Sequence, residues 1–460
     1  MLHPSLTDVT ITLDGEGCAS DYAALLLESL GARVRRQPGS AHAHPAIAWA
    51  NSGAMALTGS KDGPPQMCPA PLASCVDGVR AAFAALSGNG LPLPGAEVLG
   101  ERAALSVLRR NGAIAPGGAC RLLRAADGWL AVNLTRDDDW QLLPAWLERN
   151  VAASWDALAE QLGKYSSHEL LERGRLLGLA VAAVEAPSRE PAPWQVVTQT
   201  GVVRSAPPRE QPLVVDLSAL WAGPLCSHLL QIAGARVVKV ESLQRPDGAR
   251  QGPADFYDLL NHGKASVALD FSTAQGIGQL RDLIGQADIV IEASRPRALR
   301  QFGIDAEELV ATMPGLTWIS ISGYGREEPQ AGWIAYGDDS GAAAGLSGLL
   351  LDLTGEAMIC GDAIADPLTG WHAALAALAS FRGGGGRLIS LALRDVVGHC
   401  LQFTLPDSPD AIRRRWLEWR DVVATSGIAP AEPHARTPAG KARVLGADTA
   451  AIFASLDKPC

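Results

Sequence analysis

The second half of this chain alternates short apolar segments with helix-forming ones, and this alternation limits the fold more than any other feature. Helix-forming segments at 223–233 and 275–285 lie among the apolar runs, which occupy residues 213–217, 236–240, 266–270, 288–292 and 317–321. Strands that are apolar along most of their length are buried on both faces of a sheet. The pattern predicts an α/β fold whose large domain holds a doubly wound, Rossmann-like parallel sheet.

A proline-rich segment divides the chain. A length of 460 residues exceeds that of a usual single domain, so at least two compact units are expected. Periodicity disappears between residues 187 and 212, where prolines recur, and such a composition favours an extended connector. We place the boundary between the two units at residues 205 and 206.

Two segments of the first half recur in the second. The matching pairs are 19–34 with 222–237, which share a Leu-Leu pair and a Gly-Ala-Arg-Val ending, and 78–86 with 370–378. The offset is larger in the second pair, so the first copy lacks much of the middle of the second. Extending the second match backwards places Ser74 opposite Asp366. A chance match between two alanine-rich helices is the alternative to a duplication.

Asp366 precedes Pro367 and an alanine-rich segment that runs to about Phe381. This order is typical of a helix start, with Asp366 as N-cap and Pro367 as the first helical residue. There, backbone N–H groups and the helix dipole favour an ionised carboxylate, which can act as a nucleophile. Because serine is also a good N-cap, Ser74 would keep the capping role without the acid. Asp366 is therefore either a cap alone or a cap with a chemical function.

The composition is that of a globular protein and excludes several classes of partner. Lys and Arg total 39 against 49 for Asp and Glu, a net charge of −10, so no basic footprint for nucleic acid is present. No run of about 18 apolar residues could span a bilayer, and residues 1–8 lack the features of a secretory signal. The eight cysteines are scattered without a C-x-x-C pair, which argues against a metal site. We expect a cytoplasmic protein with neither a membrane nor a nucleic-acid partner.

Residues 212–395 resemble the class III CoA-transferases, the family of formyl-CoA transferase and the carnitine CoA-transferases. The resemblance rests on ordered blocks at residues 215–217, 222–224, 234–241, 261–270, 287–292, 295–296 and 319–325. Residues 435–456 look like the C-terminal tail of the same family.

The first half resembles this family less well. Residues 127–132, followed by Asp139 and Trp140, look like the start of the family's small domain, and residues 178–184 look like its end. The resemblance implies two incomplete family members fused in one chain. Residues 1–205 would be a degenerate copy with a small α+β domain at about 115–187, and residues 206–460 a copy with the nucleotide-fold large domain and the tail.

The resemblance implies transfer of CoA from an acyl-CoA donor to a carboxylic acid acceptor, with coenzyme A as part of the co-substrate and no metal. The family's nucleophile maps onto Asp366, which is followed four residues later by Gly370 as in relatives, and the covalent intermediate would be an aspartyl-CoA thioester. Family contacts to CoA map onto Trp221, Ala222, Leu269, Asp270, Arg295 and Arg300. Gln301 stands where relatives commonly carry an arginine. Only one such acid is found, so one active site per polypeptide is expected.

Tyr336 falls where transferases of this family often have tyrosine and where the related racemases have histidine. A phenol with a pKa of about 10 is a poor general base at neutral pH, which favours transfer over racemisation. The alternatives are an acyl-CoA racemase or isomerase, and a non-catalytic acyl-CoA-binding protein, which Gln301 and the eroded first half would suit. Relatives form interlocked homodimers, so a homodimer and a fused pseudo-dimer are both open.

Three further patterns have a structural interpretation. Asp338 and Asp339 are expected to face solvent or to cap a turn. His372 is expected to be a core or surface residue without a catalytic role. Gly383, Gly384, Gly385 and Gly386 lack a following Lys-Ser/Thr, so they are expected to form a helix-to-strand turn and not a phosphate loop.

Overall fold

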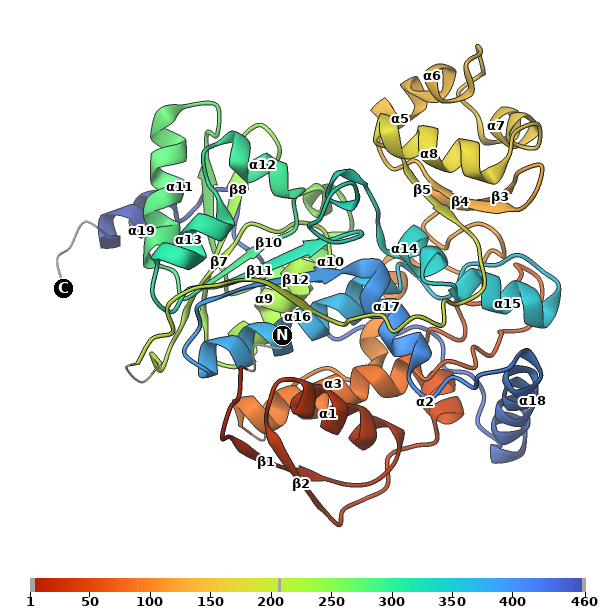
Figure 1. Ribbon diagram of the computed structural model, residues 1–460, viewed down its shortest axis with the longest axis horizontal. Helices are drawn as coiled ribbons and strands as arrows, with labels where there is room; N and C mark the ends of the chain where they lie inside the picture. The colour runs from red at the N-terminus through yellow and green to blue at the C-terminus, as the bar shows by residue number, and fades with distance from the viewer. Residues whose placement is uncertain (1–4, 89, 206–207, 457–460) are drawn as a thin grey trace.

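The structure is a computed structural model that describes residues 5–88, 90–205 and 208–456. It contains a seven-stranded sheet, a three-stranded sheet in a separate lobe and a two-stranded sheet near the N-terminus (Figure 1). Within the described ranges, no helix has the length and apolar character needed to cross a membrane.

The seven-stranded sheet comes mainly from the second half of the chain. Its strands, in spatial order, are β6 (Val196–Thr200), β12 (Arg387–Ala392), β11 (Thr317–Ser322), β10 (Ile289–Glu292), β7 (Leu213–Asp216), β8 (Arg236–Ser242) and β9 (Ala265–Leu269). All neighbours pair in parallel except β6 and β12, which are antiparallel. The predicted α/β fold with a large parallel sheet is confirmed.

Helices cover both faces of this sheet because successive strand residues point to opposite sides. Val214 and Ile289 belong to one hydrophobic cluster, with α9 (Ala222–Ile232) and α16 (Ala365–Arg382). Val215 and Val290 belong to a second cluster on the other side. That cluster includes residues of α11 (Ala274–Gln286), α12 (Pro296–Gln301), α13 (Ala306–Thr312) and α19 (Thr449–Leu456). The central helix α16 is apolar on nearly every side and is buried almost throughout.

The predicted connector is not simply extended, because it contains β6. This short strand pairs antiparallel with the edge strand β12, with Val197 opposite Ile389. Its sequence, Val-Val-Thr-Gln-Thr, has no long apolar run, which is usual for an edge strand with one partner. The predicted boundary adjoins residues 206 and 207, which lie outside the described residues. The glycine run after α16 forms the predicted helix-to-strand turn, with positive φ at Gly384, Gly385 and Gly386.

The first half begins with a β-α-β unit, which comprises β1 (Thr10–Asp14), α1 (Cys18–Ser29) and β2 (Arg33–Gln37). Its strands pair in parallel with Thr10 opposite Arg33, and β7 pairs with β8 with Leu213 opposite Arg236. Leu213 follows Thr10 by 203 positions in the chain, and Arg236 follows Arg33 by the same number. Helix α3 (Leu72–Ser87) packs on α1 in the way that α16 packs on α9.

The small lobe comprises residues 120–183 and stands beside the large sheet (Figure 1). Its antiparallel strands are β3 (Cys120–Arg124), β4 (Trp129–Asn133) and β5 (Ala180–Ala183). One face of this sheet carries α5 (Asp137–Gln141), α6 (Leu143–Leu147), α7 (Trp155–Leu162) and α8 (Ser167–Leu177), packed around Trp146. The other face packs on α14 (Gly337–Ala343) of the second half, so the lobe is fixed against the large body.

The remaining helices connect these parts. They are α2 (Pro45–Asn51), α4 (Glu101–Ser106), α10 (Ala254–Asn261), α15 (Leu346–Thr354), α17 (Leu393–Gln402) and α18 (Pro409–Ser426). The segment after α18 returns across the first half, where Ala431 donates its backbone N–H to Ala50, and Arg436 pairs with the buried Glu101 of α4. The tail therefore holds α4 in place beside the large sheet.

Candidate active site

A cavity of about 510 Å³ lies where the small lobe, α4 and the second half meet. The residues that line it include Arg102, Asn133, Thr135, Arg136, Trp221, Phe256, Tyr336, Gly337, Asp338, Ala363 and Asp366. Trp221 follows β7, so this wall lies beyond the carboxyl end of a parallel strand. Both halves of the chain contribute to the cavity.

Asp366 is not the N-cap of its helix. Helix α16 begins at Ala365 with Ile364 in the cap position, so Asp366 is the second helical residue and Pro367 the third. Proline is tolerated there because N–H groups in the first turn have no partner within the helix. Ser74 likewise is the third residue of α3, which begins at Leu72. The predicted capping role is therefore wrong for both residues, although each lies in a first helical turn.

The surroundings of Asp366 raise the pKa of its carboxyl group to about 7. Burial is the largest cause, and the charge of Arg102 opposes it. Asp338 and Asp362 raise the pKa further by repulsion, whereas a hydrogen bond from the backbone N–H of Ala222 lowers it. Desolvation thus has a larger effect on this pKa than the helix start, which was expected to favour the ionised form. The carboxyl group is fully ionised only above neutral pH.

Gly337 makes room for the Asp366 carboxylate. A Cβ atom at this position would lie 2.1 Å from Oδ2 of Asp366 and 2.6 Å from the carbonyl oxygen of Ala363. Any side chain there would displace the acid or the turn before it. Tyr336, Gly337 and Asp338 therefore form one continuous wall beside the acid.

Asp338 lines the cavity, and Asp339 is the next residue in the chain. Of the two alternatives expected for this pair, capping of a turn is confirmed, and exposure to solvent is wrong for Asp339. Asp338 accepts a hydrogen bond of 2.7 Å from the backbone N–H of Ala363, a residue with φ of 44°. Asp339 is fully buried and accepts from the Tyr336 backbone, which caps α14, and from the Asn133 amide at 2.7 Å. Burial raises the pKa of Asp338 to about 6 and that of Asp339 to about 7. The two acids hold the turn before Asp366 and join the small lobe to it.

Arg102 of α4 reaches this group from the first half. Its Nε and Nη2 atoms donate to the two oxygens of Asp362 at 2.9 and 2.5 Å, and Asp362 is fully buried. The guanidinium also lies 5.8 Å from the ring centre of Trp221. Sequence reasoning missed both residues, although Asp362 stands only four positions before Asp366. Nothing in the local sequence of α4 singles out Arg102.

The residues expected to contact CoA are divided between the cavity and other places. Trp221 and Tyr336 line the cavity, and Ala222 donates its N–H to Asp366. Leu269 ends β9, Asp270 follows it, and neither lines the cavity; Asp270 accepts hydrogen bonds from Ser272 and Gln244. Arg300 is occupied by ion pairs of 3.2 Å with Asp305 and 2.9 Å with Glu307.

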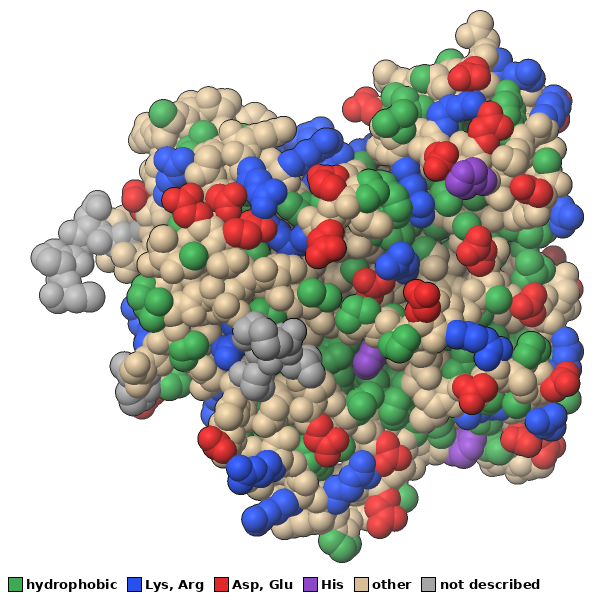
Figure 2. Space-filling model, in the orientation of Figure 1, with side chains coloured by type: hydrophobic (Ala, Val, Ile, Leu, Met, Phe, Trp, Pro, Cys, Tyr) green, Lys and Arg blue, Asp and Glu red, His purple; other side chains and the backbone are tan. Residues whose placement is uncertain are grey.

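Arg295 does not line the cavity, but it interacts electrostatically with other arginines, one of which does. Burial lowers the pKa of Arg295, and repulsion from Arg297, Arg136 and Arg245 lowers it further. Arg136 itself lines the cavity and pairs with the buried Asp139. These arginines place positive charge next to the cavity. A cluster of lysine and arginine side chains is visible between the large body and the small lobe (Figure 2).

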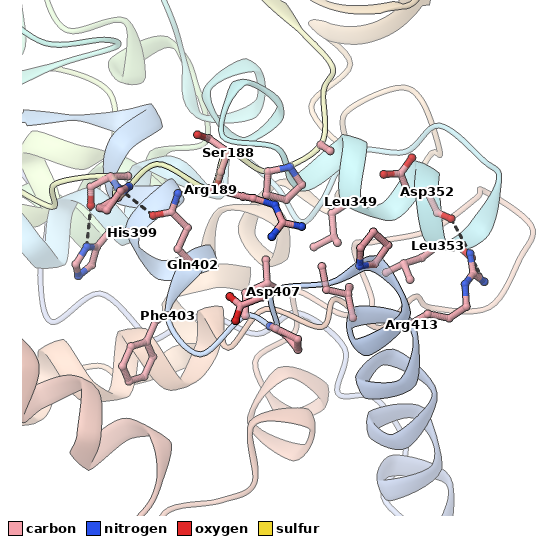
Figure 3. A pocket seen from close by; sticks show the side chains of 18 of the residues that line it. Ser188, Arg189, Leu349, Asp352, Leu353, His399, Gln402, Phe403, Asp407 and Arg413 are labelled. Carbon is pink, nitrogen blue, oxygen red and sulfur yellow. Dashed lines mark hydrogen bonds between the residues drawn. The ribbon is translucent and has the colours of Figure 1, made fainter.

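A larger cavity of about 700 Å³ lies elsewhere, between the segment 186–192, α15, α17 and the start of α18 (Figure 3). Several of its polar side chains bond backbone carbonyl groups: Gln402 donates to Ser188 at 2.9 Å, and Arg413 donates to Asp352 at 2.9 Å. His399 bonds the Ala192 carbonyl at 2.9 Å. These bonds stabilise the loop. The smaller cavity brings Asp366 together with Arg102 and Asp338, so it is the candidate active site.

His372 has the structural role that was expected. It is fully buried in α16, where its Nε2 lies 2.8 Å from the Tyr22 hydroxyl and its Nδ1 lies 2.7 Å from the Leu368 carbonyl. Both ring nitrogens are therefore engaged in the core between α16 and α1. Among the described residues, no group of three or more His, Cys, Asp or Glu side chains is arranged to hold a metal ion.

Part of the chain is similar to a known family of enzymes. Residues 210–419 match the sequence profile of CoA-transferase family III. The succinyl-CoA–D-citramalate CoA-transferase of Chloroflexus aurantiacus is 30% identical over 265 residues, which are 54% of this chain and 64% of that protein. The succinate–glutarate CoA-transferase of Agrobacterium fabrum is 33% identical over 41% of this chain and 53% of its own length.

A formyl-CoA:oxalate CoA-transferase of Escherichia coli is 27% identical over 45% of this chain and 52% of its own length. A crystal structure of a CAIB/BAIF family protein from Brucella suis shares 29% identity over 50% of this chain and 60% of that one, with a TM-score of 0.36. The chain thus spans about half to two thirds of the relatives that it matches. Residues 210–419 are thus similar to CoA-transferase family III, and Asp366, Tyr336 and Trp221 all lie within that segment.

Proposed function

We propose that this protein transfers CoA from an acyl-CoA donor to a carboxylic acid, with Asp366 as the nucleophile. The observation that carries the proposal is the position of Asp366 within the family segment, on the wall of a cavity of about 510 Å³ and beside Gly337, whose lack of a side chain makes room for the carboxylate. An acid in this position can reach a thioester that is bound in the cavity.

In the proposed reaction, a carboxylate oxygen of Asp366 attacks the thioester carbonyl and the C–S bond breaks. CoA thiolate and a mixed anhydride result. The thiolate then attacks the Asp366 carbonyl, which releases the donor acid and leaves an aspartyl-CoA thioester. The acceptor carboxylate attacks that thioester to form a second anhydride and free thiolate. Attack of this thiolate on the acceptor carbonyl gives the new acyl-CoA and restores Asp366.

The strand order supports a nucleotide-bearing co-substrate at this edge of the sheet. Counted from β7, the parallel strands follow the order 3-2-1-4-5-6, and the direction of winding reverses between β7 and β10. In doubly wound sheets ligands bind beyond the carboxyl ends of the strands at this point. Trp221 follows β7 and Arg295 follows β10, so both flank the reversal point. Arg295 with its neighbours Arg297 and Arg245 would pair with the CoA phosphates.

Mass spectrometry of the intact protein tests the proposal. The protein is incubated with succinyl-CoA or formyl-CoA, which the names of the relatives suggest as probes, and then treated with hydroxylamine or borohydride. We expect a CoA-dependent adduct at Asp366 that Asp366→Asn abolishes. Asp352→Asn is the matched control, because Asp352 lines the other cavity, and it should leave the adduct intact.

Two outcomes would replace the proposal. Binding of acyl-CoA without any modification of Asp366 would indicate an acyl-CoA-binding protein. Incorporation of deuterium at the α-carbon of a bound acyl group, without any acceptor, would indicate a racemase or isomerase. A phenol at Tyr336 favours neither proton transfer step at neutral pH, so we expect no such exchange.

We also infer that the chain is a fusion of two family copies with their boundary near residue 205. The identical offset of 203 positions at Thr10 with Leu213 and at Arg33 with Arg236 supports a common origin of the two β-α-β units. The cavity with residues from both halves supports a pseudo-dimer within one chain. The mass in solution tests this: a monomer with full activity is expected, and activity only in a homodimer would contradict it.

A further inference from the structure

The first half of the chain supplies a positive charge to the acids of the second half. Arg102 lies on α4, outside residues 210–419, and lines the same cavity wall as Asp366, Asp338 and Trp221. It binds both oxygens of Asp362, which is fully buried and begins the turn before α16. Three aspartates of the second half thus gather around one arginine of the first.

Contacts of helix α4 and contacts of the guanidinium group together fix the position of Arg102. Its neighbour Glu101 is fully buried and pairs with Arg436 of the tail, with one N–O distance of 3.0 Å, so α4 cannot shift freely. The guanidinium lies over Trp221, and a Cβ atom at Gly117 would lie 3.4 Å from Nη2. A side chain held in this way keeps its charge at a constant place, as a site for acyl transfer requires.

Resting on the proposed function of Asp366, we propose that Arg102 is a positioning residue for the nucleophile, which fixes Asp362 at the start of the turn and favours the attacking carboxylate through its charge. The segment that matches the family is then incomplete by itself, and the first half is required for the chemistry. Arg102 acts through Asp362 and the field at the cavity wall, so it is not itself a catalytic residue.

Replacing Arg102 and replacing Asp362 should shift the pKa of Asp366 in opposite directions. Arg102 lowers the pKa of Asp366, whereas Asp362 raises it. Arg102→Gln should therefore move the titration midpoint of Asp366 upward by about one pH unit or more, the usual size for loss of a nearby opposite charge. Asp362→Asn should move it downward, because one repelling charge is lost and the guanidinium is released. Arg102→Lys keeps the charge and should stay within about half a unit of the wild type.

Titration of Asp366 by nuclear magnetic resonance measures these shifts in the full-length protein without any substrate. The aspartate side-chain carboxyl groups are labelled with carbon-13, and the signal of Asp366 is assigned by its loss in Asp366→Asn. The result is therefore independent of whether CoA transfer occurs. Asp352→Asn, in the other cavity, should leave the midpoint unchanged.

Opposite shifts in Arg102→Gln and Asp362→Asn support the proposal. Unchanged midpoints, or shifts of the same sign in both variants, would overturn it and leave Arg102 with a purely structural role. Arg102→Gln leaves Asp362 buried without its partner and can unfold the protein. In that case Asp362→Asn decides, since it removes the buried acid and predicts a downward shift. A raised KM for the acceptor with an unchanged midpoint would instead make Arg102 a substrate-binding residue.

Discussion

The two β-α-β units and their partner helices have the same backbone arrangement and different chemistry. In the first unit a Cβ atom at Gly78 of α3 would lie 2.6 Å from the Ala19 carbonyl oxygen and 3.0 Å from Cβ of Tyr22. In the second, a Cβ atom at Gly370 would lie 2.8 Å from the Ala222 carbonyl oxygen and 3.1 Å from Cβ of Leu225. These partners differ by 203 positions in both cases, so the helix pairs approach each other in the same way.

The difference lies at the ends of the helices. Where the second unit has Asp366 and Trp221, the first has Ser74 and Cys18 at the corresponding positions. Ser74 forms a hydrogen bond with Cys18, and burial raises the pKa of that thiol to about 11. A thiol that stays protonated at neutral pH is a poor nucleophile. The comparison separates two requirements: the close glycine packing is common to both units and belongs to the fold, whereas the acid is present in one unit and belongs to the proposed chemistry.

The largest effect is expected when the second unit is given the residue of the first. Asp366→Ser removes the proposed nucleophile and should lower the rate of CoA transfer by at least about 10³-fold. Ser74→Ala, the change at the corresponding position, should leave the rate within about twofold. Steady-state assays with an acyl-CoA donor and acid acceptor measure both. Equal losses in the two variants would mean that both helix starts have only structural roles.

Gly337 tests how closely the acid is confined. Gly337→Ala should lower the rate of transfer by about 10²-fold, because a displacement of the reacting group by about 1 Å has that order of effect. Gly248→Ala is the control, since it also lines the cavity but its nearest neighbour, a Leu220 side-chain carbon, would be 3.6 Å away. A normal rate in Gly337→Ala would show that Asp366 need not occupy this position during the reaction.

The pH dependence of the transfer rate tests the acid that the second unit has and the first unit lacks. The pKa of Asp366 is raised to about 7, and in the proposed reaction the residue attacks only as the carboxylate, so the rate should rise with pH through 7 and level off above 8. Below the pKa, about tenfold is lost for each pH unit. Single-turnover release of CoA thiol between pH 5 and 9 measures this limb. A rate that is flat down to pH 5 would contradict a nucleophile whose pKa is raised in this way.

The sequence predicts the parts of this site that depend on local pattern, and misses those that depend on packing between distant segments. Alternating apolar runs were sufficient for the parallel sheet, and the repeat pointed to Asp366. The edge strand β6 was missed because one neighbour imposes no long apolar run on it. Arg102 and Asn133 were missed because they lie far from Asp366 in the chain and meet it only in the folded protein. The place of Asp338 in the cavity wall was missed because it depends on the contact between Asp338 and the turn at Ala363.

The smallest effects concern stability, where the two units should behave alike. Gly78→Ala and Gly370→Ala each force a Cβ atom against a backbone oxygen, so each should lower the free energy of unfolding by about 1–3 kcal/mol. Gly278→Ala in α11 is the matched control: its Cβ would meet nothing within 4 Å, and the lower entropy of the unfolded chain should stabilise the protein by about 0.4–1 kcal/mol. Thermal and denaturant unfolding measure all three. If only Gly370→Ala is destabilising, α3 does not pack on α1 as closely as α16 packs on α9, and the likeness of the two units ends at their strands.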